Sequence, residues 1–267
     1  MATVRPPAVS GLFYPASAAE LRSAVEGYLR EAPSRNGAPA PKAVIAPHAG
    51  YVYSGPIAGS AFQTLAGAAA GSTIERVVLL GPSHFVPFRG LALPGHESFG
   101  TPLGTVKLQG AGAQASLRMP QVRIIPEAHV REHSLEVELP FLQVLLGDFK
   151  LVPLVVGDAE PDEVAEVLDR LWGGAETLIV VSSDLSHYLP ADAARRVDRE
   201  TADEILALGG PLDPRQACGA APINGLLQAA RTRGLMAQLL DLRNSADTAG
   251  DPSRVVGYGA FAFHERG

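Results

Sequence analysis

Three apolar runs of this chain each end in a loop that carries a histidine. His48 follows the run in AVIAPHAGY, His84 follows the run in VVLLGPSHF, and His187 follows the run in TLIVVSSDLSHY. In open α/β sheets, ligands bind beyond the carboxyl ends of the parallel strands, so polar groups placed there converge. A single loop histidine is ordinary on a protein surface, but the repetition predicts one shared site.

Histidines gathered at one site serve proteins in two common ways. Neutral imidazole coordinates metals, and the same ring transfers protons near neutral pH. Two imidazoles with one carboxylate are typical of non-haem Fe(II) enzymes, whereas additional histidines with zinc are typical of metal-assisted hydrolysis. His48 and His84 are the candidate metal ligands, and these residue types alone leave both metals open.

A carboxylate accompanies the third histidine. Asp184 lies three residues before His187 in SSDLSHY. In a turn, this spacing lets the carboxylate orient the imidazole through a hydrogen bond. We therefore expect Asp184 to position His187, and His187 to act as a catalytic acid or base.

A second polar segment carries His133 and Glu136 within REHSLEVELPFLQVLL. On a helix, these two residues are i,i+3 neighbours and share a face, so Glu136 would hydrogen-bond a site histidine or the substrate. The alternative is structural, because acidic residues in a first helical turn stabilise an ordinary helix N-terminus. His133 and Glu136 are both candidate catalytic residues.

Two further residues have simpler interpretations. Cys218 is the single cysteine and lies among small residues on a helical pattern. No adjacent basic group would lower its pKa, which indicates a packed thiol rather than a nucleophile. Asp247 belongs to NSADTAGD, whose residue types are typical of a turn. From this segment alone, Asp247 is either a turn residue or a functional one.

The elements that would position these residues alternate along the chain. Continuous apolar runs, typical of strands covered on both faces, occupy 43–47, 76–81, 89–93, 122–125, 151–156, 177–182, 237–242 and 255–263. Apolar stripes at helical spacing occupy 17–31, 55–68, 134–146, 160–171, 190–208 and 215–231. This alternation predicts one α/β domain over residues 1–267, with a central, mostly parallel or mixed β-sheet flanked by helices.

Composition argues against several classes of protein. Apolar residues make up 46% of the 267 positions, which is enough for a full core. The net charge of −6 implies no basic face, so we expect no nucleic-acid partner. One cysteine allows no intrachain disulfide and is consistent with a reducing compartment. Because no apolar run resembles a signal peptide or a membrane span, we expect a cytoplasmic protein without a membrane partner.

The order of the motifs resembles that of a known family. Seven blocks follow one another nearly from end to end: RPPAVSGLFYP, APHAGYVYSG, LLGPSHF, FGTPLG, EHSLEVELPFLQ, VSSDLSHY and NSADTAGDPSRVVGYGAFAF. Each block is short, but the ordered set resembles the Memo family, called AmmeMemoRadiSam system protein B in bacteria.

The resemblance implies a fold similar to the LigB-like class III extradiol dioxygenases, which use Fe(II) and O2 to open catechol rings. In that group, two histidines and a carboxylate bind the metal, and another histidine acts as a base. Carried over by position, His48 and His84 match the metal-site histidines. Asp184 and His187 match the acidic and basic pair of the pocket.

The resemblance leaves the third metal ligand as the point of difference. Animal Memo proteins have a cysteine in the loop before the last strand, where an ungapped alignment places Thr248 of this chain, beside Asp247. Asp247 is therefore the hypothesised carboxylate ligand, which would complete a set of two histidines and one carboxylate. We expect Fe(II) as the cofactor, with zinc and copper as the alternatives.

Three functions follow from these residues and this resemblance. The first is a metal-dependent redox enzyme of the dioxygenase-like type, acting on an unknown small-molecule or peptide substrate. The family also implies association with a radical-SAM protein and an AMMECR-type protein. The second is a non-enzymatic protein that binds a partner or peptide in the same cleft. The third is a zinc-dependent hydrolase, which would use the same imidazoles.

Overall fold

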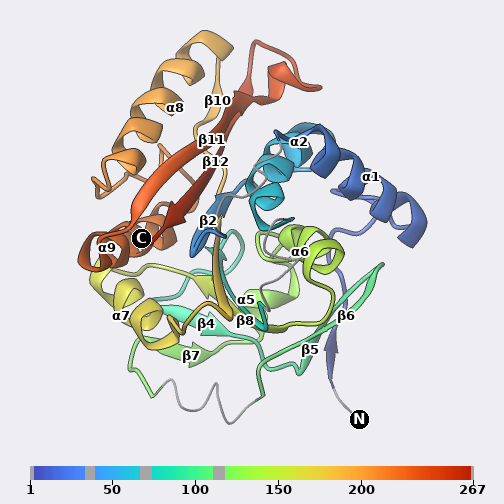
Figure 1. The fold of residues 1–267 in the computed structure, drawn as a ribbon, viewed down its shortest axis with the longest axis vertical. Helices are drawn as coiled ribbons and strands as arrows, with labels where there is room; N and C mark the ends of the chain where they lie inside the picture. The colour runs from blue at the N-terminus through green and yellow to red at the C-terminus, as the bar shows by residue number, and fades with distance from the viewer. Residues whose placement is uncertain (1–2, 34–39, 67–73, 111–117, 266–267) are drawn as a thin grey trace.

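Parallel strands form the middle of the central sheet. The structure is a computed structural model and describes residues 3–33, 40–66, 74–110 and 118–265 (Figure 1). Neighbouring strands follow the order β2 (Ala43–Ala46), β9 (Thr177–Ser182), β3 (Arg76–Pro82) and β8 (Lys150–Val156). Nearly all their side chains are buried, because both faces are covered. Their carboxyl ends therefore lie along one edge.

Antiparallel pairs extend the sheet on both sides. Beside β2 lies β12 (Val255–His264), which also pairs with β10 (His187–Leu189) and β11 (Met236–Asn244). Beside β8 lies β4 (Leu91–Leu93), which pairs in parallel with β7 (Val122–Ile124). Among the described residues, the order is β10-β12-β2-β9-β3-β8-β4-β7, with β11 attached to β12. The predicted mixed sheet is confirmed.

Helices cover both faces of this sheet (Figure 1). The hydrophobic core on one face includes residues of α1 (Ala18–Glu31), α2 (Tyr51–Phe62) and α6 (Leu139–Leu146). The core on the other face includes residues of α7 (Pro161–Leu171), α8 (Ala191–Leu206) and α9 (Ala220–Arg233). The chain is thus a single α/β domain, as predicted. No helix in the described part of the chain has the length and apolar character needed to span a membrane.

A short second sheet and a short helix were absent from the sequence prediction. The sheet is formed by β1 (Val4–Arg5), β5 (Ser98–Thr101) and β6 (Gly104–Lys107), in the order β1-β5-β6. The helix is α5 (Glu127–Val130). Elements of two to four residues contain too few side chains to show a period, so apolar patterning does not detect them.

The predicted helix over 134–146 begins later than expected. A single 3-10 turn spans Glu136–Glu138, and regular helix follows from Leu139. Pro140 lies at the first positions of α6, where its missing N–H costs nothing, whereas within a longer helix it would break a hydrogen bond. His133 consequently lies in the irregular segment before the 3-10 turn and not on one helical face with Glu136.

The helix predicted over 55–68 also has a different start. Helix α2 begins at Tyr51, directly after Gly50, and continues through a 3-10 turn over Gln63–Leu65. Its predicted last two residues, 67–68, lie outside the described residues. The earlier start shortens the loop after β2 and brings the helix close to His48.

The N-terminal segment is fastened to the domain by the buried Glu136 carboxylate. Glu136 forms an ion pair with Arg5, and both side chains are inaccessible to solvent. The same carboxylate accepts hydrogen bonds from the backbone N–H groups of Ala8 and Val9 and from the hydroxyl of Tyr14, at 2.7, 3.0 and 2.6 Å. Protein donors thus occupy the Glu136 carboxylate, which gives this residue a structural role.

Replacing Glu136 with alanine should lower the free energy of unfolding by about 3–5 kcal/mol, because the guanidinium of Arg5 would remain buried without its partner. Chemical denaturation followed by circular dichroism measures this change. The control is Arg89→Ala, which removes an exposed ion pair to Glu163 at 3.4 Å and should cost less than about 1 kcal/mol. A similar small loss for both variants would contradict the structural role of Glu136.

Candidate metal centre

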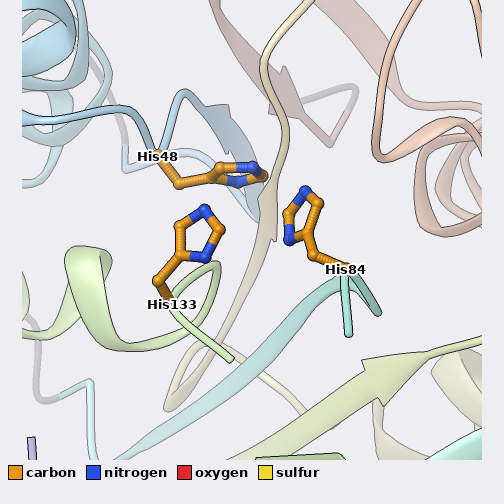
Figure 2. Close-up of side chains that lie close together, drawn as sticks. All are labelled: His48, His84 and His133. Carbon is orange, nitrogen blue, oxygen red and sulfur yellow. The ribbon is translucent and has the colours of Figure 1, made fainter. Parts of the chain in front are cut away.

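Three histidines from separate loops converge at the carboxyl edge of the sheet (Figure 2). His48 lies two residues after β2, His84 lies two residues after β3, and His133 lies just before the 3-10 turn that leads to α6. One ligand atom from each side chain lies within 4.8 Å of the other two. This spacing is suited to a single metal ion held by three imidazole nitrogens.

The three rings have a defined mutual arrangement. The rings of His84 and His133 are stacked, with centroids 4.6 Å apart and an angle of 19° between their planes. The ring of His48 stands nearly perpendicular to both, at centroid distances of 5.2 and 5.4 Å. Figure 2 shows the three rings facing a common point from three directions.

Each imidazole has its Nδ1 atom close to a protein group. His84 Nδ1 lies 2.8 Å, and His133 Nδ1 lies 3.5 Å, from Oε1 of Glu132. His48 Nδ1 lies 2.8 Å from Oγ of Ser182, and that hydroxyl lies 2.7 Å from the Glu138 carboxyl. Metal-binding histidines typically use one ring nitrogen for such a contact and the other for the metal. The Nε2 atoms are therefore the candidate ligand atoms, of which Nε2 of His48 lies 3.4 Å from the sulfur of Cys218.

Glu132 is the residue that joins two of these histidines. Its buried carboxylate accepts hydrogen bonds from the backbone N–H groups of His84, His133 and Ser134, at 2.7 to 2.9 Å. Burial raises the pKa of Glu132, but the hydrogen bonds from His84 and Ser134 outweigh it and lower the pKa to about 2. Sequence analysis gave Glu132 no role, although its position next to His133 was a usable signal.

The environment lowers the pKa of two of the three imidazoles. Burial, followed by the nearby charges of His84, His133 and His187, lowers the pKa of His48 well below its usual value. Burial also lowers the pKa of His133 to about 4, although the charge of Glu132 opposes this. Neutral imidazole is the form that binds metals. Both side chains are therefore ready to act as ligands at neutral pH.

Asp184 and His187 lie beside this cluster but do not pair in the expected way. Asp184 accepts a hydrogen bond from the backbone N–H of His48 at 2.8 Å, and burial raises its pKa to about 6. His187 Nδ1 lies 2.8 Å from the carbonyl oxygen of Leu185. Asp184 thus holds the loop of His48, while the carbonyl of Leu185 orients His187.

A cavity of about 830 Å³ adjoins the cluster. Its lining includes Ser83, next to His84, and Cys218, whose sulfur lies 3.4 Å from Nε2 of His48. Much of the remaining lining is apolar and includes Val86, Phe88, Val156 and Leu212. The volume is within the range of small-molecule sites, and Cys218 is the lining residue that contacts a histidine of the cluster.

Comparison with known proteins identifies the family. A family model described as Memo-like protein matches residues 5–262. The chain belongs to the Memo-like family. A MEMO1 family protein of Methanopyrus kandleri is 37% identical over 97% of this chain and 98% of its own length. A MEMO1 family protein of Aquifex aeolicus is 35% identical over 96% of this chain and 97% of its own length.

A solved structure shares the fold of this Memo-like chain. It is the crystal structure of an uncharacterized protein from Escherichia coli K12, with a TM-score of 0.51 and 15% sequence identity. The match covers 82% of this chain and 98% of the other. At this identity the likeness concerns the fold alone and supports the α/β architecture.

The structure does not bring Asp247 of this Memo-like protein to the cluster. Asp247 ends a 3-10 turn, Ser245–Asp247, and accepts hydrogen bonds from Arg195 at 2.7 Å and from the backbone N–H of Asn244 at 2.9 Å. The carboxylate is therefore hydrogen-bonded within its own turn and to a side chain of α8. His133, a predicted catalytic residue, is the third histidine of the cluster that could hold a metal ion.

Cys218 lies closer to the site than its sequence context indicated. Its sulfur is beside His48 and lies 3.7 Å from the carbonyl oxygen of Asp184. Burial, then the charge of Asp184, raises the pKa of the thiol to about 12, so it is not an activated nucleophile. The thiol nevertheless offers a sulfur donor next to the nitrogen donors. Only the tertiary fold reveals this position, since Cys218 is 170 residues from His48.

The two candidates for the third ligand predict different metal contents. His133→Ala, His48→Ala and His84→Ala should each reduce the bound metal well below one ion per chain, because each removes one of three nitrogen donors. Asp247→Ala should leave the stoichiometry unchanged. Elemental analysis of metal-loaded protein measures both effects. Loss of metal in Asp247→Ala with retention in His133→Ala would reverse the assignment.

Glu132→Gln should weaken metal binding by about 10- to 100-fold, because it removes the charge that orients His84. Competition with a chelator measures the affinity, and circular dichroism checks the fold. Glu20→Gln is the matched control, since Glu20 is exposed on α1 and far along the chain from the histidine loops. An affinity within about threefold of the wild type would contradict the role of Glu132.

Proposed function

We propose that this Memo-like protein is a metal-dependent oxidoreductase of the dioxygenase-like type, with Fe(II) as its cofactor. The observation that carries the proposal is the set of three imidazoles whose Nδ1 atoms face protein groups. Such a set is preorganised to hold a metal through Nε2. The family resemblance to LigB-like dioxygenases favours iron, and zinc and copper are also compatible with imidazole ligands.

The donor set fits a divalent first-row metal. His48, His84 and His133 would supply three imidazole nitrogens, and three protein ligands leave positions open for other molecules. When bound, the metal would supply Lewis-acid polarisation of a substrate oxygen and, in the case of iron, redox chemistry. Glu132 would keep His84 and His133 oriented, and Ser182 would do the same for His48.

His187 is the proposed base of the reaction. Because its Nδ1 faces the carbonyl of Leu185 at 2.8 Å, that nitrogen carries the proton in the neutral ring, and Nε2 is free to accept one. His187 acts electrostatically on both His48 and Asp184, which is consistent with a position at the edge of the cluster. Its role would be to take a proton from a substrate hydroxyl.

The cavity beside Ser83 and Cys218 is the proposed substrate site. The apolar part of its lining would favour an organic ligand with an apolar body. A radical-SAM protein and an AMMECR-type protein remain the proposed partners, and the cytoplasm remains the proposed location. These proposals rest on the family resemblance and the composition of the chain.

A zinc-dependent hydrolase is the second candidate. One observation favours it: the third donor is His133 rather than a carboxylate, and three histidines are a known ligand set of catalytic zinc. In that case His187 would remove a proton from the attacking water rather than from an organic hydroxyl.

Metal loading followed by an activity screen distinguishes these functions. The protein is purified anaerobically and supplied with Fe(II), Zn(II) or copper in turn, and bound metal is measured. The redox proposal predicts about one iron per chain and oxygen consumption with catechols. It also predicts that His187→Gln retains the iron and loses at least 100-fold in rate.

Other outcomes would overturn the redox proposal. Tight binding of zinc with ester hydrolysis and no oxygen uptake would support the hydrolase. Absence of any bound metal in correctly folded protein would instead support a non-enzymatic cleft that binds a partner or peptide.

A further inference from the structure

Buried polar groups surround the hydroxyl of Ser182, the last residue of β9. Three atoms lie within hydrogen-bond distance of its Oγ: Nδ1 of His48 at 2.8 Å, Oε1 of Glu138 at 2.7 Å and the carbonyl oxygen of Ser134 at 2.7 Å. The side chains of Ser182 and Glu138 are inaccessible to solvent. Buried polar groups are nearly always hydrogen-bonded, so these groups must satisfy one another.

The single proton of Ser182 decides the direction of each hydrogen bond. A serine hydroxyl donates one hydrogen bond and can accept two, whereas a carbonyl oxygen only accepts. The proton of Ser182 must therefore point to the carbonyl of Ser134, since otherwise two oxygen atoms would meet at 2.7 Å without a proton between them. Ser182 then has only lone pairs to offer to Glu138 and His48. Each of these two neighbours must supply the proton for its own contact.

The surroundings of Glu138 are those of an uncharged carboxyl group. In the part of the chain that the structure describes, Glu138 forms no ion pair, and its Oε2 has no hydrogen-bond partner. The hydroxyl of Tyr51 donates its proton to the carbonyl of Val137 at 2.7 Å instead. By contrast, Glu132 and Glu136 each accept several hydrogen bonds. A buried carboxylate without donors is strongly disfavoured, whereas a neutral carboxyl group tolerates burial far better.

The charges near Glu138 favour the same protonation state. Burial raises the pKa of Glu138 well above its usual value, and the charge of Asp184 raises it further. The Asp184 carboxylate is fixed beside the proposed metal centre, where it accepts the hydrogen bond from the backbone N–H of His48. Two negative charges buried close together repel each other, so Glu138 is the group that keeps its proton.

We propose that Glu138 is a neutral carboxylic acid at neutral pH and that it positions the ring of His48 through Ser182. Glu138 donates its proton to Ser182, and Ser182 donates to the carbonyl of Ser134. The hydrogen bond that remains is one that His48 donates from Nδ1 to Ser182. His48 is thereby held in the tautomer whose lone pair is on Nε2, the candidate ligand atom.

Glu138 is a positioning residue, because it acts on the metal ligand only through Ser182. Its effect on metal binding rests on the proposed metal centre, whereas its protonation state does not. Two buried glutamates would thus support the cluster in opposite charge states. Glu132 is an ionised acceptor with a pKa lowered to about 2, and Glu138 is a neutral donor. Glutamine has N–H groups but no charge, so it can replace the donor but not the ionised acceptor.

Infrared spectroscopy of the full-length protein tests the proton on Glu138 directly. A neutral carboxylic acid has a carbonyl-stretching band that a carboxylate lacks. Wild type should show this band at about pH 8, where carboxyl groups with a pKa of about 6, such as Asp184 and Asp198, are ionised. The band should disappear in Glu138→Gln and persist in Glu132→Gln. Its absence from wild type, or its persistence in Glu138→Gln, would overturn the proposal.

Competition between the full-length protein and a chelator for Zn(II) tests the positioning role. Glu138→Leu removes the donor, so the proton of Ser182 and the tautomer of His48 are no longer fixed, and zinc should bind about tenfold more weakly. Glu138→Gln keeps an N–H donor at the same place and should restore the affinity to within about threefold of the wild type. The matched change Glu132→Gln should not retain the affinity, because it removes a charge.

Two results of the zinc competition would overturn the positioning role. One is an unchanged affinity in Glu138→Leu, and the other is an equal loss in Glu138→Gln and Glu138→Leu. A wild type that binds no metal would overturn the proposed metal centre and the positioning role with it. The infrared band would still decide the protonation state of Glu138 in that case.

Ser182→Ala takes the place of Glu138→Leu if that variant does not fold, as judged by circular dichroism. It removes the acceptor of the Glu138 proton and of the His48 ring. The carboxylic acid band should therefore change in frequency, and zinc should bind about tenfold more weakly. An unchanged band in correctly folded Ser182→Ala would show that Glu138 does not donate to Ser182 and would overturn the proposal.

Discussion

The candidate metal centre depends on one buried carboxylate. Glu132 accepts hydrogen bonds from the backbone of His84 and His133 and from a ring nitrogen of His84. Because Glu132 and His133 belong to one loop and His84 belongs to another, this single charge fixes the relative position of the two loops. Burying a carboxylate is costly unless donors surround it, so the loops and the carboxylate stabilise one another. The stacking of the two rings follows from this shared partner.

The edge of the sheet at which the site forms could be predicted from the sequence. Local apolar runs indicate which segments are buried strands and in what order they follow along the chain. His48 and His84 follow such runs directly, and their convergence is a consequence of parallel topology. His133 and Cys218 are different, since no strand precedes either of them. Their positions depend on how the segment before α6 and the start of α9 pack against the sheet. The sequence did not decide the role of Asp247, because a turn aspartate and a ligand aspartate have the same sequence context, and the structure places it in a turn beside Arg195.

The architecture was predicted more completely than its details. Long apolar runs specified the buried strands and the helices on both faces, as expected when burial is the main signal. Elements of two to four residues, such as β1 and α5, leave no periodic trace. The predicted start of α6 was wrong. The apolar spacing of a helix continues across Pro140, but a regular helix cannot continue through a proline. This boundary separates His133 from Glu136, which fastens the N-terminal segment instead of facing the site.

The contact between His48 and Ser182 joins residues that are 134 positions apart in the sequence. During synthesis, His48 therefore leaves the ribosome long before the strand that supports its ring exists. The histidines of the cluster cannot adopt their final arrangement in a partial chain that ends before β9. A contact between residues so far apart in sequence must overcome the entropy of closing a long loop, so the cluster is complete as a metal site only when β9 has joined the sheet. A metal bound by the complete cluster would then link residues that leave the ribosome far apart in time, and its binding energy would stabilise the finished domain.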